Sequence, residues 1–357
     1  IELHNPTDAP IDVGGWFLTD TFSAPEKYRL PSPTIIPALG FAVFTETHFN
    51  PTPGQPPSFA LGADGDDVWI FSADEAGRLT GYVQGFDFEA TASGVSLGRH
   101  TNSVGEVDYP PMASVTLGHP NAAPRAGPVV ISEIMYHPAA TGIANQPASF
   151  IELANISTTN VPLSDPAMPD SPWRLRNGVA FAFPPGAALP SGRRLLVVGF
   201  DPVADAEARA SFISLYAIPP DVPLHGPWQG RLAKDEDTIE LAQPAVAQGQ
   251  DTPYALVDKV HYLDLAPWPT GADGSGASLQ RRTLASYGNE PTNWFASTPT
   301  AGAVNQPNAL PIVRLTAPSQ SAVLHWPADV LLSASAEDSD GRIVRVDFFN
   351  HDQKLAQ

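Results

Sequence analysis

The chain has 357 residues, 43% of them hydrophobic, and carries a formal net charge of -19 at pH 7. This length suggests about two or three domains with real cores. The scarcity of basic residues opposes nucleic-acid binding, no apolar run is long enough to span a membrane, and the absence of Cys excludes disulfides and zinc–thiolate sites. The 39 Pro and 28 Gly residues favour short strands joined by many turns, so we expect an all-β fold.

Four landmarks occur twice along the chain, in the same order each time. The difference in residue number between a landmark and its repeat increases along the chain, so the second copy contains extra residues. We place these extra residues in loops between the shared strands. We therefore predict two copies of one β-sandwich, in which recurring residues serve folding and residues private to one copy are candidates for recognition. The landmarks are Ile-Glu-Leu-x-Asn at 1–5 and 151–155, Trp16 and Trp173, Ser-Leu-x-Arg at 96–99 and 278–281, and Thr-x-Gly-x-x-Asn at 116–121 and 300–305.

Short apolar runs bounded by Pro, Gly or Asp predict matching strands in the two copies. They are residues 41–44 and 67–71 in the first copy and 195–198 and 238–241 in the second. Such strands are typical of a two-sheet antiparallel, immunoglobulin-like sandwich. One helix is expected near residues 203–210, as an excursion in a loop and not as a core element.

The second copy opens with a strand-like run at residues 129–136 that has no counterpart in the first copy. We interpret the first copy as lacking its initial strand and the chain as a fragment. After Pro311 the sequence predicts about three strands, at 312–315, 330–334 and 343–349, of a further immunoglobulin-like sandwich. The predicted domains are 1–124, 127–309 and an incomplete 311–357, strung out along Pro-rich junctions.

The ordered motifs resemble the lamin tail domain, an immunoglobulin-like β-sandwich found in nuclear lamins and in many bacterial secreted or surface proteins. The resemblance covers residues 1 to about 124 and about 127 to 309, and the first copy departs from it by Gly98 and by Tyr109 where the second has Trp294. The segment from 311 is similar to bacterial immunoglobulin-like domains with an Asp-x-Asp-Gly turn. The resemblance implies a non-catalytic part of a large exported protein.

Residues 94–98 fit the G-x-S-x-G nucleophile motif around Ser96, but their counterpart at 276–280 lacks the second Gly. Because the repeat indicates strands at both places, we predict no catalytic residue. Ser96 and Ser278 should begin strands, and Arg99 and Arg281 should lie at the sheet surface, each paired with a carboxylate such as Glu2 or Glu152. The nine His residues form no metal-ligand spacing.

Two acidic turns, at residues 64–67 and 234–237, are interpreted as hairpin turns and not as metal sites. Asp338 and Asp340 are better candidates for Ca²⁺, because alternate Asp side chains before a Gly can converge on one ion. The alternative is an ordinary Asp-Gly hairpin turn. No other cofactor is predicted.

Trp228 and Trp268 lie in Pro-rich loops private to the second copy. Aromatic side chains in loops bind ligands more often than those in strands do. Trp228 and Trp268 are therefore the predicted ligand-binding residues. The sequence as a whole predicts an extracellular or cell-surface module that spaces domains and binds protein or glycan. The alternative is an accessory region of an exported hydrolase, nuclease or CotH-type kinase whose catalytic domain lies elsewhere.

Overall fold

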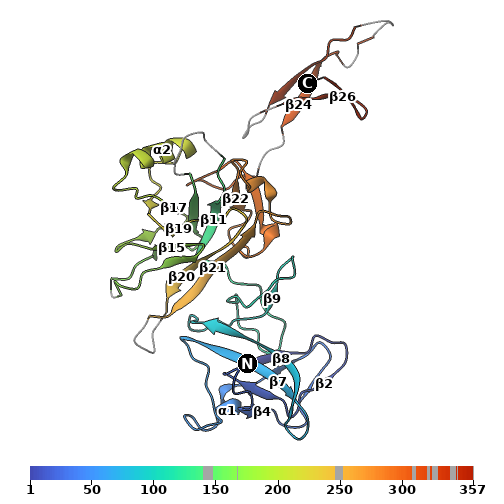
Figure 1. The fold of residues 1–357 in the computed structure, drawn as a ribbon, viewed down its shortest axis with the longest axis vertical. Helices are drawn as coiled ribbons and strands as arrows, with labels where there is room; N and C mark the ends of the chain where they lie inside the picture. Colours follow the sequence, from blue (N-terminus) through green and yellow to red (C-terminus); the bar gives the residue numbers. More distant parts are fainter. Residues whose placement is uncertain are drawn as a thin grey trace.

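The protein is described from a computed structural model, and its strands dominate the chain (Figure 1). The predicted all-β fold is confirmed: the helical elements of the described residues are α1 (Glu46–Phe49), α2 (Ala206–Tyr216) and two single 3₁₀ turns, η1 (Thr270–Ala272) and η2 (Pro291–Asn293). The helix α2 is also the longest of these. The structure describes residues 1–139, 148–166, 168–245, 252–307, 311–319, 322–323, 329–337, 343 and 345–356.

Strands β1 to β10 form the N-terminal unit. Its largest sheet has the order β4-β3-β7-β8, and the pairs β1-β6 and β2-β5 lie against it around a core that includes Leu18, Ile70 and Phe44. The hairpin β9-β10 follows this sheet. The strands are β1 (Glu2–His4), β2 (Ile11–Asp12), β3 (Phe17–Thr19), β4 (Tyr28–Arg29), β5 (Ile35–Ile36), β6 (Phe41–Val43), β7 (Gly65–Ala73), β8 (Leu79–Glu89), β9 (His100–Thr101) and β10 (Val107–Asp108).

Strands β11 to β23 form the central unit, a sandwich of two large sheets. One sheet has the order β18-β17-β12-β11-β22-β23 and the other the order β19-β15-β14-β20-β21, with the small pair β13-β16 beside them. The strands are β11 (Val129–Met135), β12 (Phe150–Asn155), β13 (Val161–Pro162), β14 (Arg174–Asn177), β15 (Val179–Ala182), β16 (Ala188–Leu189), β17 (Arg194–Val198), β18 (Leu224–His225), β19 (Gln229–Gly230), β20 (Glu236–Pro244), β21 (Tyr254–Leu263), β22 (Ser278–Arg281) and β23 (Trp294–Ser297).

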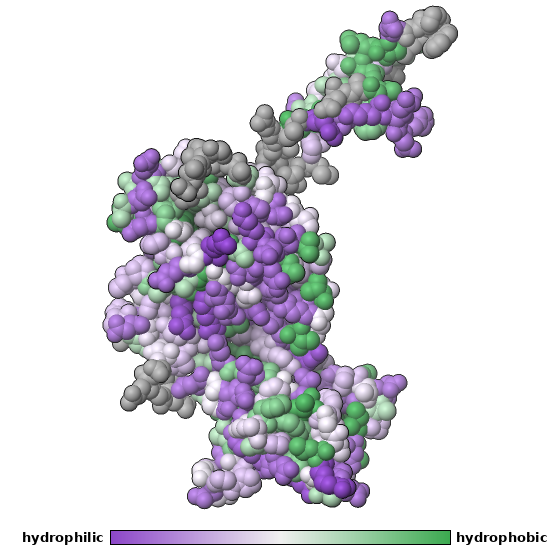
Figure 2. All heavy atoms as spheres, viewed as in Figure 1, coloured by the Kyte–Doolittle hydropathy of each residue, from purple (hydrophilic) through white to green (hydrophobic). Residues whose placement is uncertain are grey.

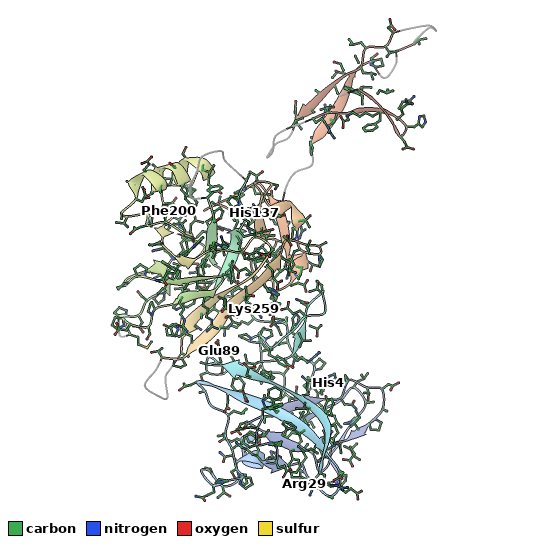
Figure 3. All side chains as sticks on the ribbon, in the orientation of Figure 1. His4, Arg29, Glu89, His137, Phe200 and Lys259 are labelled. Carbon is green, nitrogen blue, oxygen red and sulfur yellow. The ribbon has the colours of Figure 1, made fainter. Side chains whose placement is uncertain are left out.

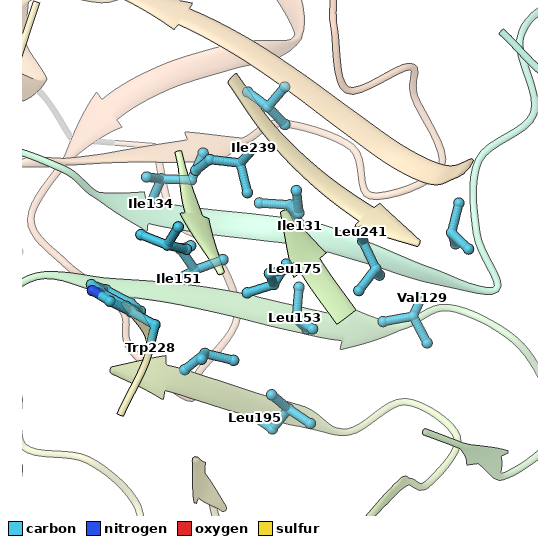
Figure 4. Close-up of a cluster of buried hydrophobic side chains, with 14 of the residues drawn as sticks. Val129, Ile131, Ile134, Ile151, Leu153, Leu175, Leu195, Trp228, Ile239 and Leu241 are labelled. Carbon is cyan, nitrogen blue, oxygen red and sulfur yellow. The ribbon is translucent and has the colours of Figure 1, made fainter. Parts of the chain in front are cut away.

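The core of the central unit lies between its two sheets (Figure 4). Ile151 and Leu153 of β12 face Leu175 of β14 and Leu241 of β20, and all four are almost completely buried. Each such side chain contributes roughly 1.5–3 kcal/mol by leaving water. The apolar strands predicted at 195–198 and 238–241 therefore supply this core, as β17 and β20.

Helix α2 packs on the outer face of the six-stranded sheet, where Phe212 is fully buried against Phe150. Asp205 caps the helix by accepting a hydrogen bond from the Ala208 amide at 2.9 Å. The helix begins later and runs further than the sequence predicts, and it is a packing element and not an excursion in a loop. The prediction was wrong because it considered only residues 203–210. Phe212, the apolar side chain that packs the helix against the sheet, lies beyond that stretch.

The C-terminal segment consists of two hairpins that project away from the central unit (Figure 1). Its strands are short and its apolar residues are open to solvent: Ile312, Val313 and Leu315 of the first strand are each more than half exposed. The strands are β24 (Ile312–Ala317), β25 (Ser333–Glu337), β26 (Phe348–Asn350) and β27 (Gln353–Ala356).

The two copies repeat their hydrogen bonds as well as their motifs. The Asn5 side-chain amide donates to the carbonyls of Ala9 at 2.8 Å and Ile36 at 3.2 Å. The Asn155 amide donates in the same way to the carbonyls of Thr159 at 2.8 Å and Leu189 at 2.7 Å. Both Asn residues are 2% exposed, so the repeated Asn closes the same turn in each copy.

The closing motif repeats too. The Gly118 amide donates to Glu2 Oε2 at 2.5 Å, and the Gly302 amide donates to Glu152 Oε2 at 2.6 Å. The side-chain amides of Asn121 and Asn305 donate to the carbonyls of Arg99 at 3.1 Å and Arg281 at 2.9 Å, respectively. The recurring polar residues therefore perform the same structural work in both units, as the repeat predicts.

Candidate functional site

Neither serine of the nucleophile-like motifs has the surroundings that nucleophilic catalysis needs. The segment after Ser96 leads into strand β9 and not into a helix, and Ser278 is fully buried at the start of β22. The Ser278 hydroxyl donates to the Glu133 carboxylate at 2.5 Å. A hydroxyl that is buried and already donating to a structural carboxylate is not placed to attack a substrate.

Two carboxylates, Glu133 and Glu152, are buried side by side as register partners in β11 and β12. Glu133 accepts from the Ser278 hydroxyl and from the amide and hydroxyl of Thr300, both at 2.9 Å. Glu152 accepts from the Ser132 hydroxyl at 2.6 Å and from Arg194 Nε at 3.1 Å. These donors fix both carboxylates in place, and neither has an open side toward solvent.

Burial raises the pKa of Glu152 to about 8, and the neighbouring charge of Glu133 adds to this effect. Burial also raises the pKa of Glu133, against the hydrogen bonds from Ser278 and Thr300. A raised carboxyl pKa is typical of general acids. Here, however, both side chains are fully covered, so the pair pins the turn at Thr300–Gly302 to the sheet and does not face a substrate.

Arg281 is fully buried, which corrects the prediction that it lies at the sheet surface. Its Nη1 lies 2.6 Å from Asp258 Oδ2 and donates to the Ile131 carbonyl at 3.1 Å. Its partner is therefore Asp258 of β21 and not Glu152, whose salt bridge is to Arg194. The sequence could not indicate this pairing, because β21 joins the site only through the packing of the two sheets. In the first copy Arg99 is exposed, as predicted.

Trp228 and Trp268, the predicted ligand-binding residues, are 8% and 3% exposed and belong to the core of the central unit. Trp268 packs near Trp294, with 6.2 Å between ring centroids, and Trp228 lies among the core residues in Figure 4. The expectation of a surface platform is thus corrected: the Pro-rich loops fold back over the sandwich and bury the rings. A ring covered on its faces offers no stacking surface to a ligand.

An open hollow of about 460 Å³ lies beside Trp228, between β15, β18 and the loop that leads into α2. Phe181, His225, Gln229 and Asp201 line it. Burial lowers the pKa of His225, so its imidazole is neutral at pH 7 and can both donate and accept a hydrogen bond. All the residues that line the hollow belong to the second copy. At the matching place the first copy has only the four-residue helix α1, and no described strand there corresponds to β18.

The two units meet along a polar joint made by the hairpin β9-β10. The Asn102 side-chain amide donates to the Asn289 carbonyl at 3.1 Å, and both the amide and the hydroxyl of Ser103 donate to Glu290. Glu89, the last residue of β8, pairs with Arg176. Figure 3 shows Glu89 and Lys259 where the two units approach each other.

Asp108 is the centre of this joint. It accepts from Lys259 Nζ at 2.9 Å, from the Tyr287 hydroxyl at 2.9 Å and from the Asn289 amide at 2.6 Å. Burial acts to raise the pKa of Asp108, but the hydrogen bond and charge of Lys259, helped by Asn289 and Tyr287, outweigh it and lower the pKa. Asp108 therefore stays ionised and holds three side chains of the central unit.

His261 adds a further contact to the joint, with Nδ1 3.3 Å from Glu106 Oε1 and Nε2 2.9 Å from Glu236 Oε1. The copies keep separate cores, and the hairpin of one copy packs on the sheet of the other, a contact that the sequence analysis did not predict. The spacing of the motifs does not predict this joint. In the sequence alone, its acidic residues cannot be distinguished from ordinary solvent-exposed charges.

The acidic turns lead into β7 and β20, and neither is the hairpin turn that the sequence predicts, because β7 pairs with β3 and β8 and β20 pairs with β14 and β21, not with the strands that precede the turns. Asp66 accepts from the Gly62 amide at 2.8 Å, and Asp237 accepts from the Ala233 amide at 2.9 Å, so the two turns are again equivalent. Among the described residues no three His, Asp or Glu side chains lie close enough together to hold a metal ion. Asp338 and Asp340, the calcium candidates, lie outside the described residues.

Comparison with known proteins identifies a family for the C-terminal segment. A family model of the bacterial Ig domain matches residues 311–357, in agreement with the similarity seen in the sequence of that segment. No curated protein matches the chain. Within the part of the chain that the structure describes, no helix has the length and apolarity needed to cross a membrane. The all-β fold with a bacterial immunoglobulin-like segment at its C-terminal side is typical of a non-catalytic surface or binding module.

Proposed function

We propose that the chain is an extracellular or cell-surface spacer and binding module of a larger exported bacterial protein. The joint centred on Asp108 carries this proposal, because its hydrogen bonds and ion pairs favour a fixed angle between the two units. A fixed angle is what a spacer needs, whereas a flexible linker would leave the distance between its ends undefined. The bacterial Ig match at residues 311–357 supports a continuation by modules of the same kind.

We further propose that residues 1–124 and 127–309 are two lamin-tail-like sandwiches. The motif order supports this assignment, and so do the repeated hydrogen bonds of Asn5 with Asn155 and of Glu2 with Glu152. Both pairs have structural roles, so the residues that recur in the two copies account for the fold. A binding site is therefore expected among the features that only one copy has.

The proposed binding surface is the hollow lined by His225 and Gln229, in place of the two buried Trp residues. It combines an aromatic side chain, Phe181, with the hydrogen-bonding groups of His225 and Gln229 and the carboxylate of Asp201, a mixture suited to a peptide or a glycan. A glycan array and an extended-peptide library, each screened with the H225A/Q229A protein beside the wild type, would test it. Binding that is equal in both proteins would remove the hollow from the proposal.

The spacer role is tested by small-angle X-ray scattering on the full chain. We expect the wild type to fit one arrangement of the two units, and the K259A/N289A variant to give a broader distribution of distances. A matched control is R193A, which breaks only an exposed ion pair with Asp221. A wild-type distribution as broad as that of K259A/N289A would contradict the spacer proposal.

A further inference from the structure

The strand β15 has a neighbour along only part of one of its edges. On that edge β19 pairs with the first two residues of β15, Val179 and Ala180. No described strand pairs there with the last two, Phe181 and Ala182, although β14 pairs with both on the opposite edge. Phe181 and Ala182 are also among the residues that line the hollow. The end of an open sheet edge therefore lies in the hollow.

The backbone of Ala182 points towards this open edge. In an antiparallel ladder, residues that exchange hydrogen bonds with a neighbouring strand alternate with residues that do not. The Phe183 amide donates to the Trp173 carbonyl at 3.0 Å, so Phe183 and Phe181 bond towards β14, and Ala182 between them does not. The amide and the carbonyl of Ala182, which is an exposed residue, consequently point away from β14 and towards the hollow.

The segment that precedes β19 does not complete this edge. The register of β19 with β15, continued by two residues, would place Pro227 opposite Ala182. Proline has no amide hydrogen to donate. The next residue, Trp228, donates its amide to the carbonyl of Val198 in the six-stranded sheet at 3.1 Å. The segment therefore turns away from β15 towards the other sheet.

The hollow also carries a negative charge. Hydrogen bonds from the amides of Ala204 and Val203, both at 2.9 Å, lower the pKa of the Asp201 carboxyl, which stays ionised at pH 7. No Lys or Arg is among the described residues that line the hollow. The visible face of the central unit is mostly hydrophilic (Figure 2), which suits a charged ligand better than an apolar one.

The charge of the chain favours a ligand from another molecule. A cationic side chain in the hollow would find the Asp201 carboxylate and no competing cation in the lining. Basic residues are scarce in this chain, which has 19 Lys and Arg against 38 Asp and Glu. A basic segment is therefore more readily supplied by a separate polypeptide than by a further stretch of this one.

We propose that the end of β15 accepts an extended, basic segment of another polypeptide as a short added strand. The backbone of this segment pairs with the amide and the carbonyl of Ala182, and a Lys or Arg side chain reaches Asp201. Strand addition takes its affinity from main-chain hydrogen bonds and its specificity from the pockets beside them, which His225 and Gln229 supply here. The strand-acceptor role rests on the proposed function of the hollow and narrows its ligand to a peptide.

The test selects short peptides from a random display library on the full chain and measures their affinity for two variants. Ala182→Pro removes an amide that β14 does not use, a change that the edge of a strand tolerates. Ala182→Val keeps the amide and adds a side chain of similar size. We expect the selected peptides to be rich in Lys or Arg and to bind Ala182→Pro about tenfold more weakly than Ala182→Val, because one hydrogen bond is lost.

A second variant removes the charge and leaves the backbone unchanged. Asp201→Asn keeps the side-chain oxygen that accepts from Val203 and Ala204, so the loop should stay folded. The selected peptides should bind this variant more weakly than wild type at low salt, and the difference should shrink as salt is added. Equal affinity for wild type and Asp201→Asn would overturn the requirement for a basic segment.

Amide hydrogen exchange identifies the strand that receives the peptide. We expect the Ala182 amide to exchange more slowly when a selected peptide is bound. An Ala182 amide that is already protected in the free protein would mean that the chain covers this edge itself, and would overturn the proposal. Equal affinity for Ala182→Pro and Ala182→Val would overturn strand addition.

The glycan array separates this proposal from the proposed function. Glycan binding that is lost in H225A/Q229A, with no peptide selected, would overturn the strand-acceptor role and leave the hollow as a binding site. Binding of neither peptides nor glycans would overturn both.

Discussion

Arg281 and Asp258 form a buried ion pair across the two sheets of the central unit, with Nη1 2.6 Å from Oδ2 and side-chain exposures of 0% and 3%. The same Asp258 carboxylate accepts from the Ile131 amide at 2.8 Å, and Arg281 donates to the Ile131 carbonyl. The pair therefore binds both backbone groups of one residue in β11. These hydrogen bonds offset part of the cost of burying two charges, although Arg281 Nε is buried without a hydrogen-bond partner.

Removing one partner should leave the other charge buried and uncompensated. We expect Arg281→Met to lower the free energy of unfolding of the central unit by about 3–5 kcal/mol. The matched control is Arg99→Met, which removes the exposed counterpart and should change stability by less than about 0.5 kcal/mol. Urea titrations followed by hydrogen exchange of each unit would measure both, and equal effects would contradict the different environments assigned to the two Arg residues.

The buried carboxylates predict a pH dependence. The pKa of Glu152 is raised to about 8 in the folded protein, so the folded state holds a proton that the unfolded state has released above about pH 4.3. Its contribution to stability is present at low pH and is lost as the pH rises from about 4.3 to about 8.

We therefore expect the Glu152→Gln variant to lose less stability than the wild type between pH 5 and pH 8, because Gln stays neutral throughout. The difference between the two proteins isolates this residue from the other titrating groups. Glu2→Gln, the counterpart change at a half-buried site, is the control for the substitution itself. Chemical denaturation would measure the free energy of unfolding of both proteins across this pH range. If the two profiles run parallel, the raised pKa of Glu152 does not contribute to the pH dependence of stability, and the prediction fails.

The joint predicts a measurable coupling between the units. In a double-mutant cycle of Asp108→Asn and Lys259→Met, we expect an interaction energy of about 1 kcal/mol, because both side chains are about four-fifths buried. The exposed pair of Arg193 and Asp221 should give less than about 0.5 kcal/mol. Since the pKa of Asp108 is lowered, the Lys259 contact holds above the unfolded pKa, near 3.9, and fades as the pH falls below it. A coupling near zero at pH 7 would contradict this account.

The cores of the two units should respond differently to the same truncation. Leu153 is fully buried between two sheets, and its counterpart Leu3 is only half-buried. We expect Leu153→Ala to cost about 2–5 kcal/mol and Leu3→Ala about 1–2 kcal/mol. Unfolding of each unit, followed separately by hydrogen exchange, would measure the two costs. A larger loss at Leu3 would mean that the N-terminal unit is packed more completely than its exposed surface indicates.

The repeat made much of the fold predictable, because Asn5 with Asn155 and Glu2 with Glu152 recur as motifs and recur as hydrogen bonds. The predicted strands at β6, β7, β17 and β20 are confirmed for the same reason: their apolar runs are short and bounded by turn residues. The sequence failed where distant segments meet. Asp258 pairs with Arg281 only after the sheets pack, and Trp228 and Trp268 become core residues only when their loops fold back.

The joint changes where this chain can be cut. Division at the Pro-rich stretch near residue 126 follows the repeat, yet it would strip the carboxylates of Glu89, Glu106 and Asp108 from Arg176, His261 and Lys259. In the released second half Lys259 would lose Asp108, and Arg176 would keep only Glu240 as a carboxylate partner. A second half produced on its own should consequently bind a cation exchanger more tightly than the undivided polypeptide does.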